Sequence, residues 1–464
     1  MNGRVLRIEL RRSVAPWAGV VILAPALTFL YVPGGAWWSG TTAWTAQWTP
    51  LAMWTRSLLF YLWPLAIGLG ALQGLRDHRS KMSELLTSTP RPALQRAATL
   101  TGATAITLAG AFMFLVLVGG VQVLAHTEYT HLGWLPISLV GVFFLVAGAV
   151  LGMGAARALP STLTPPALAM GAFVFTALMH MSLGRTETDT RDGFTSTEPN
   201  RVSLLSPTLE DVREAFVTLS ASVHVGQTFW LLGMAATGFA LLVAVTPRAR
   251  LIALTPVLAG AAIALLVLPS DPGRMYVVDK AAAELVCDGP VCVTKTQQAR
   301  LADLAGPGKE ALRLLHGALG DQAPDSVREN TAVLPKGSTP RWSRKTVLLD
   351  FDDGIVAAAT GEELTRALIA KGMVPGCTPV GWSSFGGDDF AQTVAAGWVL
   401  GDLKPLAGTP ARMRSEVEAE TRPVWKKLKA LPRAEQLSRI NAMRAAALSC
   451  EGSPFDVLSG GASR

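Results

Sequence analysis

Charged residues are scarce in the first part of this sequence. Of the 464 residues only 16% are Asp, Glu, Lys or Arg, while 50% are hydrophobic. This composition is too apolar for an ordinary water-soluble protein of this length. A helix needs about 20 apolar residues to cross a bilayer, with roughly 17 to 25 tolerated. Seven such segments contain no charged residue: Ala15–Val32, Leu58–Leu75, Ala97–Leu124, Trp134–Ala156, Ala167–Leu183, Thr228–Val245 and Leu251–Leu268.

The composition changes after Pro269, where charges, prolines and turn residues become evenly spread. We therefore predict an α-helical polytopic membrane bundle of about seven transmembrane helices over residues 15–269, and a soluble α+β domain over residues 270–464. Two strands are expected in that domain, at Met275–Val278 and Thr346–Phe351. The helices expected there are Lys309–Leu319, Glu362–Lys371, Asp388–Leu400, Arg412–Leu428 and Arg433–Leu448.

Cysteine is missing from the first part, and all four cysteines lie in the second. An even number confined to one soluble domain indicates an oxidising compartment. Four cysteines permit three pairings. We prefer Cys287 with Cys292, because the short turn between them brings them together, and this leaves Cys377 with Cys450. Free buried thiols are the alternative.

The short loops carry an uneven share of basic residues, which are retained on the cytoplasmic side of membranes. With the N-terminus inside, the inner segments hold twelve Lys or Arg residues and the outer loops five. The five placed outside are Arg56, Arg185, Arg191, Arg201 and Arg213. Seven crossings then put residues 270–464 outside, so we expect a multi-pass plasma-membrane protein with a cytoplasmic N-terminus and an extracytoplasmic C-terminal domain. We expect the first segment to stay as an anchor; a cleaved signal peptide is the alternative.

Three local patterns in the first part of the chain are typical of membrane proteins or of helix starts. Trp37, Trp38, Trp44, Trp48 and Trp54 are expected to form an aromatic belt at the outer interface. In the outer loop between the fifth and sixth segments, Ser206 and Pro207 are typical of a helix start. The apolar stripe expected on that helix is Leu209, Val212, Phe216 and Leu219. His180 is a titratable side chain within a span, which we interpret as structural.

The sequence has no complete nucleotide-binding or metalloprotease motif. The nearest approach to a P-loop, at Gly306–Glu310, has Asp303 in place of the first glycine and Glu310 in place of the hydroxyl residue. Gly361 and Thr365 stand where a zincin-like helix would carry its two histidines. The net charge of +7 comes without a basic stripe and interleaved aromatics, so we expect no nucleic-acid partner.

The segment Thr346–Gly354 ends in Asp350-Phe-Asp352-Asp353 and is similar to the strand-end Asp-x-Asp of haloacid-dehalogenase-like phosphatases. Gly354 stands where that family has a threonine. We favour a strand that ends in a solvated acidic turn. We expect no catalytic residue, no metal and no cofactor in this chain.

The inner loop between the second and third apolar segments carries the most informative pattern. Apolar residues recur there at helical spacing, charged residues lie on the other side, and Pro90 ends the pattern. Its Glu-Leu-Leu-x-Ser-x-Pro-Arg sequence, Glu84 to Arg91, resembles the cytoplasmic segment of ABC-2 type transporter permeases. The residues that the resemblance implies for docking on an ATPase are Arg79, Lys81, Met82, Glu84, Leu85 and Leu86.

The resemblance extends over about the first 250 residues. Residues 1–14 are similar to the interfacial elbow helix of that family. The resemblance implies that this chain is the permease subunit of an exporter. Its partners would be a cytoplasmic ABC ATPase that holds ATP and Mg, and a second permease copy or paralogue. The seventh span and residues 270–464 are additions to the six-span family core. The alternatives are a membrane receptor or anchor with an outer binding domain, and a degenerate membrane-tethered peptidase-like protein.

Overall fold

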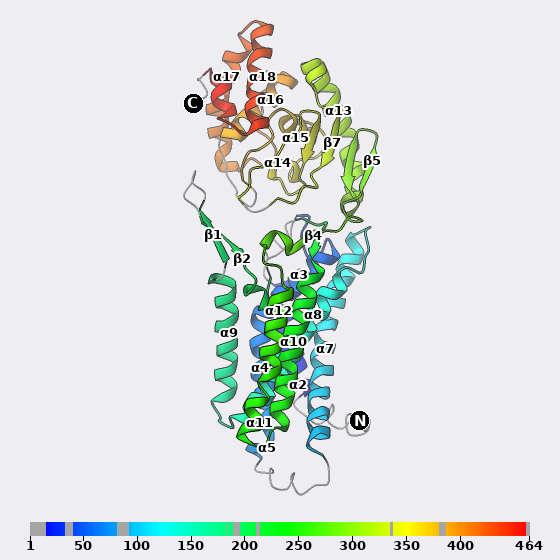
Figure 1. Cartoon of the computed structure of the whole chain (residues 1–464). Coiled ribbons are helices and arrows are strands. Elements are labelled where there is room, and N and C mark those ends of the chain that lie inside the picture. The colour runs from blue at the N-terminus through cyan, green and yellow to red at the C-terminus, as the bar shows by residue number, and fades with distance from the viewer. Residues whose placement is uncertain are drawn as a thin grey trace. The chain divides into compact units, whose positions relative to one another are not determined.

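The computed structural model describes residues 15–32, 40–80, 92–182, 184–188, 195–209, 214–334, 337–379 and 387–460 (Figure 1). The chain divides into two compact units, Met1–Val277 and Val278–Arg464. The first unit is a helical bundle, and the second combines one small sheet with helices. Helices dominate the described residues as a whole.

The first unit, called the membrane unit below, has a helix at each of the seven expected apolar segments. These helices are α2 (Ala15–Tyr31), α4 (Leu59–Gly74), α7 (Ala93–His126), α8 (Trp134–Ala158), α9 (Thr164–Ser182), α10 (Ala221–Val243) and α12 (Thr255–Val267). Three shorter helices accompany them, α3 (Trp48–Ser57), α5 (Arg76–Arg79) and α11 (Pro247–Ile252). The helix starts follow local sequence: the Thr246 hydroxyl accepts from the backbone N–H of Ala249 at the start of α11, with Pro247 in the first helical turn.

Fewer helices than seven are long and apolar enough to cross a membrane. Among the described residues four pass by length and composition: α7, α8, α10 and the stretch Pro247–Val267. The helices α3 and α4 form a fifth if this bent pair is one span. The apolar parts of α2 and α9 are shorter. The chain is thus a membrane-embedded helical bundle with four or five candidate spans.

Glycines bring the central helices of the membrane unit into backbone contact. At Gly70 and Gly74 of α4, an added Cβ would overlap the backbone of Ala149 and Met153 in α8. The same holds in the other direction for Gly152 of α8 against α4. In lipid no hydrophobic force drives helices together. Small residues at the crossings let the backbones approach closely, and the resulting van der Waals contact stabilises the pair. The helix α8 is therefore packed directly on α4.

The opposite side of α8 packs on α10 in the same way. A Cβ at Gly154 would overlap the carbonyl oxygen of Gly238, and a Cβ at Gly238 would overlap that of Val150. The series continues to α12, because a Cβ at Gly233 of α10 would come within 2.5 Å of the carbonyl oxygen of Pro256. Helices α4, α8, α10 and α12 thus form one continuous row of close contacts.

The pair α3 and α4 is bent by 49° at Leu58. Two hydroxyls next to the bend bond back to the preceding turn. The Thr55 hydroxyl donates to the carbonyls of Leu51 and Ala52, and the Ser57 hydroxyl donates to that of Trp54. Such bonds compete with the helical ladder and bend helices. The bend is therefore encoded locally.

Two small ribbons complete the membrane unit. Strands β1 (Gly184–Thr188) and β2 (Thr195–Pro199) pair antiparallel after α9. Strand β3 (Val217–Leu219) is hydrogen-bonded to β4 (Tyr276–Val278), and the N–H of Ser220 donates to the carbonyl of Met275. Residues 270–277 therefore pair back with the membrane unit, so the structural boundary lies after Val277.

The second unit contains a four-stranded sheet in the order β5-β6-β7-β8, over Leu285–Asp288, Val291–Thr294, Ser326–Glu329 and Thr346–Leu349. Strands β5 and β6 form an antiparallel hairpin whose turn places Gly289 at a φ of 64°. The pairs β6–β7 and β7–β8 are parallel. Helix α13 (Leu301–Leu319) makes the crossover between β6 and β7, as parallel strands require.

Helices of the second unit lie at each expected segment, although α13 begins at Leu301 rather than at Lys309. They are α13, α15 (Gly361–Met373), α16 (Gly387–Leu400), α17 (Arg414–Lys429) and α18 (Arg433–Ser449), with short helices α14 (Gly354–Ala357) and α19 (Pro454–Ser459). Their apolar faces share one core with the sheet. Strand β8 begins at Thr346 as expected but ends at Leu349, and the expected strand at Met275 begins at Tyr276.

One buried arginine ties the second unit together. Arg444 of α18 is 4% exposed, and its guanidinium donates to three backbone carbonyls. The acceptors are Gly372 at 3.2 Å, Gln322 at 2.5 Å and Arg344 at 3.1 Å. These carbonyls lie in three separate parts of the unit, so one side chain fixes α18 against the end of α15 and two loops.

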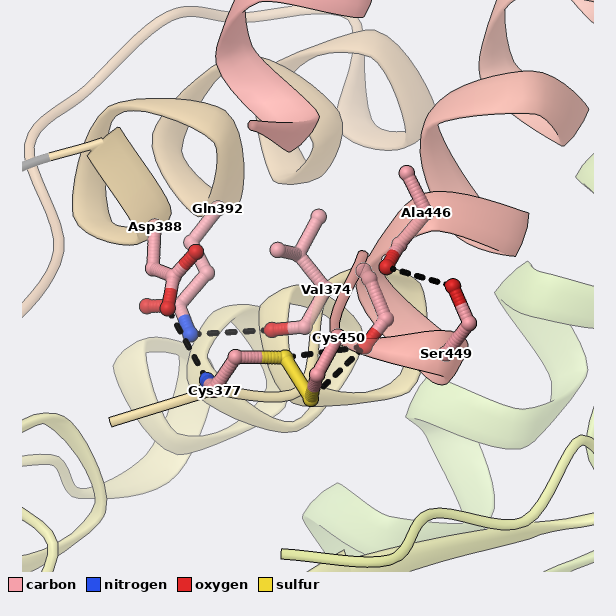
Figure 2. The surroundings of a disulfide bond; sticks show 8 residues. Val374, Cys377, Asp388, Gln392, Ala446, Ser449 and Cys450 are labelled. Atoms are coloured by element: carbon pink, nitrogen blue, oxygen red, sulfur yellow. Dashed lines mark hydrogen bonds between the residues drawn. A yellow bond between two sulfur atoms is a disulfide. The ribbon is translucent and has the colours of Figure 1, made fainter. Parts of the chain in front are cut away.

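The structure joins Cys287 to Cys292 and Cys377 to Cys450. This is the pairing that the short turn favoured. The first bond crosses the β5–β6 hairpin, and the second ties the segment after α15 to the end of α18. Figure 2 shows the second bond, where the Asp388 carboxylate accepts from the Cys377 N–H at 2.9 Å. Both bonds lie within the second unit.

Enlarging Gly70 should disturb the bundle. We expect Gly70→Ala to destabilise the membrane unit by about 1–3 kcal/mol, because the new methyl group overlaps the backbone of Ala149 and cannot be accommodated by a side-chain rotation. Gly110→Ala in α7 is the matched control, since nothing lies within 4 Å of its Cβ position. The unfolding temperature in detergent should fall for the first variant and stay or rise for the second. Equal behaviour of both would contradict the close contact.

Candidate functional site

A buried charge lies in the membrane unit, close to the bend between α3 and α4. Arg56 is in the last turn of α3 and only 1% exposed. Its Nε donates to the carbonyl of Pro207 at 3.2 Å, and its Nη2 donates to Oε1 of Gln227 at 2.5 Å. Its guanidinium carbon lies 5.6 Å from the ring centroid of Phe144 in α8. Three distant segments therefore meet at one arginine.

Gln227 of α10 is the second member of the site and is fully buried. A guanidinium has only donors, so the amide must turn its oxygen toward Arg56. Its Nε2 is then free to donate to the carbonyl of Leu204, at 2.7 Å. Gln227 thus links the arginine to the chain segment that precedes Pro207.

This segment, residues 203–209, covers the two side chains and is itself buried. The Asn200 side chain accepts from the N–H groups of Val202 and Ser203, each at 2.9 Å, and starts a short 3₁₀ turn over Ser203–Leu205. The helix expected to start at Ser206 is wrong as predicted, because residues 207–209 are not helical and Leu219 belongs to strand β3. The hydroxyl of Ser206 bonds to that of Thr208 instead of capping a helix.

The charge of Arg56 is not balanced by a carboxylate. Among the described residues no Asp or Glu forms an ion pair with it, and Nη1 has no hydrogen-bond partner. The Nδ1 atom of His224, one turn before Gln227 on α10, is also buried without a partner. Buried charges and buried polar atoms are normally paired, since desolvation makes an unpaired one costly. The site therefore has spare donor capacity in a water-poor environment.

The structure corrects two expectations in this region. Arg56 is expected in an outer loop, but it lies in a helix packed inside the bundle. The sequence signal that could have found it is its isolation, because Arg56 is the only charged residue between Trp48 and Leu75. The aromatic belt is wrong for Trp44, which is fully buried, and Trp48 stacks on Trp134 at 5.2 Å. Trp37 and Trp38 lie outside the described residues.

The residues expected to dock on an ATPase are only partly described. Arg79 is the last residue of α5, directly after α4, and its side chain is exposed. Lys81, Met82, Glu84, Leu85 and Leu86 lie outside the described residues, as does the expected elbow helix over residues 1–14. The side chain of His180 also lies outside them.

The acidic turn of the second unit lies at the carboxyl ends of parallel strands, with Glu329 ending β7 and Asp350 following β8. Asp350 accepts from the N–H of Asp352 at 2.8 Å. Asp353 caps α14 and pairs with Lys371 at 2.5 Å. No group of three or more metal-binding side chains occurs within the part of the chain that is described. The Asp350 and Asp353 carboxylates therefore accept hydrogen bonds from nearby backbone N–H groups, and Asp353 also pairs with a lysine.

Two of these carboxyl groups have perturbed acidity. Burial raises the pKa of Glu329 above its ordinary value, although its carboxylate accepts from the N–H of Thr294 at 2.6 Å. Burial also raises the pKa of Asp350, and the neighbouring carboxylates of Asp352 and Asp353 add to the shift. Both groups therefore hold a proton more strongly in the folded unit than in the unfolded chain.

Comparisons with protein-family models, with curated proteins and with solved structures find no match to this chain.

The bond between Arg56 and Gln227 can be measured with a double-mutant cycle. Gln227→Leu should destabilise the membrane unit by about 2–3 kcal/mol, because it removes the acceptor of a buried charged donor. The loss should be smaller once Arg56→Met is present, with a coupling of about 1–3 kcal/mol. Unfolding of the detergent-solubilised chain in SDS gives the four free energies. Additive losses would show that the two side chains do not interact.

The buried acid Glu329 should make stability depend on pH. A raised folded pKa contributes stability that is complete below the ordinary Glu pKa and is lost as pH rises through the folded pKa. We therefore expect the unfolding temperature of the second unit to fall as the pH rises above the ordinary Glu pKa of 4.5. Glu329→Gln keeps an acceptor for Thr294 and should reduce this fall. Calorimetry of the full chain measures it, with the exposed Glu416→Gln as a control that should leave the fall unchanged.

Proposed function

We propose that this chain is the membrane-spanning permease subunit of an ABC-2 type exporter, energised by a separate ATPase. The observation that carries the transport function is the buried guanidinium of Arg56 inside an apolar bundle. A charge is costly at such a place, and ionisable residues within membrane bundles generally mark substrate or ion pathways. A protein that only anchored an outer domain would have no use for this cost.

The bend beside Arg56 supports the same function. Interrupted helices are tolerated within membranes only where they are packed in protein or line a cavity, and transporters commonly bind substrate at them. The pair α3 and α4 is interrupted at Leu58, two residues after Arg56. A polar site next to a helix break is what a solute pathway needs, because the break exposes backbone groups as well.

The energy source rests on the resemblance of Glu84–Arg91 to the docking segment of ABC-2 permeases. The segment follows α4 through the exposed turn α5, so a force on it would act on the helix that carries the bend. In this proposal Arg79, Lys81 and Glu84 pair with charges of the ATPase, and Met82, Leu85 and Leu86 fill an apolar groove. ATP and Mg would stay on the partner, and a second permease copy or paralogue would complete the exporter.

The topology belongs to the proposal as well. Seven crossings from a cytoplasmic N-terminus would put the second unit outside the cell. The two disulfides support that side, since disulfides persist in oxidising compartments. The additional span and the outer unit would then serve the exit side of the pathway.

The energy coupling can be tested by co-purification. We expect the full chain, isolated from its native membranes in mild detergent, to bring down an ATPase with a P-loop sequence. Glu84→Lys together with Leu85→Asp should reduce its yield at least about tenfold, which corresponds to about 1.4 kcal/mol of binding. Mass spectrometry and ATP hydrolysis in the eluate measure the partner.

The matched control is Glu128→Lys, which repeats the Glu-to-Lys substitution at an exposed position between α7 and α8. It should leave the yield unchanged. Recovery of no ATPase with the unaltered chain would refute the exporter and favour a membrane receptor or anchor.

A further inference from the structure

We propose that Arg56 binds an anionic oxygen group, such as the phosphate of a ligand, within the membrane unit. The binding residues would be Arg56 and His224, with Gln227 as a positioning residue. This inference rests on the proposed function only in treating the bound group as part of a transported molecule. The binding itself requires no ATPase.

The first argument is charge balance. Arg56 is 1% exposed, carries a permanent positive charge and has two neutral acceptors, the Pro207 carbonyl and the Gln227 amide. Among the described residues no Asp or Glu forms an ion pair with it. A neutral acceptor satisfies a donor but leaves the charge uncompensated in a medium of low dielectric constant. An anion bound at this site would compensate the charge.

The second argument is geometric. The Nη1 atom of Arg56 and the Nδ1 atom of His224 are both buried and lack a partner. His224 and Gln227 are three residues apart on α10, so their side chains lie on the same side of the helix. Gln227, on this side of α10, also holds the guanidinium of Arg56 at 2.5 Å. The Nη1 donor of Arg56 thus remains for an acceptor group, as does the Nδ1 atom of His224 in the tautomer that protonates it.

The third argument concerns access to the site. The covering segment, residues 203–209, is held in place by hydrogen bonds from Arg56 and Gln227 themselves. The Arg56 bond to the Pro207 carbonyl and the Gln227 bond to the Leu204 carbonyl join it to the two helices. A guanidinium gains ion pairing as well as a hydrogen bond from an anion, but only the hydrogen bond from the neutral Pro207 carbonyl. An anion would therefore compete with this carbonyl for the guanidinium and loosen the segment, whereas a neutral ligand would offer no such gain.

The same chemistry is offered by a lipid headgroup and by free phosphate, and the test separates them. The full chain, purified in a neutral detergent, is titrated with inorganic phosphate, with short-chain phosphatidylglycerol and with short-chain phosphatidylcholine. Binding is followed by the change in tryptophan fluorescence and by the unfolding temperature. We expect at least one of the two anionic probes to bind and to raise the unfolding temperature. Phosphatidylcholine carries the same phosphate group but adds a choline cation, which the positive charge of Arg56 repels, so it should bind more weakly than phosphatidylglycerol.

The decisive variant is Arg56→Gln, which should weaken binding of the anionic probe about 10- to 100-fold, as expected for loss of a charged hydrogen bond. Arg274→Gln is the control, because Arg274 is an exposed arginine of the same unit. It should bind like the unaltered chain.

A second variant keeps the test valid if Arg56→Gln does not fold. Gln227→Glu places a carboxylate on the guanidinium and supplies the missing negative charge from within. We expect it to weaken binding of the anionic probe, although the bond to Arg56 is kept. A purely structural role for Arg56 predicts no such loss.

Three results would overturn the inference: no binding of either anionic probe, equal affinity of the Arg56→Gln variant, or equal affinity for the two lipids. Recovery of an ATPase together with any of these would leave the exporter standing and remove the anion site. Anion binding without recovery of an ATPase would leave the anion site standing and refute the exporter.

Discussion

Direct backbone contact between helices at glycine is the interaction on which the membrane unit depends. Helix α8 is the common element, since α4 packs against it at Gly70 and α10 at Gly238. In an apolar solvent no hydrophobic force holds such helices together, so their association relies on close contact. The same contacts fix where α3 and α10 lie along α8. Arg56, Gln227 and the ring of Phe144 meet because the glycines set that register.

Among the described residues two arginines are well buried, and their guanidinium groups are satisfied differently. Arg444 in the second unit gives each of its three nitrogens a backbone carbonyl from a fixed part of the fold. Arg56 has two acceptors and one nitrogen without a partner among the described residues. The first arrangement is that of a structural tie, complete in itself. The second arrangement leaves the Nη1 donor of Arg56 without an acceptor, and a group from outside the chain would bond to it.

The elements could largely be predicted from sequence, because a long uncharged run or a helical stripe is a local property. Helices α15, α16 and α18 start within one residue of their expected positions. The number of spans stays a prediction, since the described parts of α2 and α9 form shorter apolar helices than the four or five candidate spans. The site could not be predicted from sequence. Arg56 is 171 residues from Gln227 in sequence, and its burial depends on packing that no local pattern contains. The helix expected from Ser206 failed because the partners of that segment are α3 and α10.

The two disulfides impose an order on how the second unit is made. Cys287 and Cys292 are five residues apart, so they can join as soon as their hairpin has left the ribosome and reached an oxidising space. Cys377 must then wait until 73 further residues, including α16, α17 and α18, have been synthesised. Once Cys287 and Cys292 are joined, Cys450 is the one cysteine left for Cys377, so closure of the hairpin first would exclude the other two pairings.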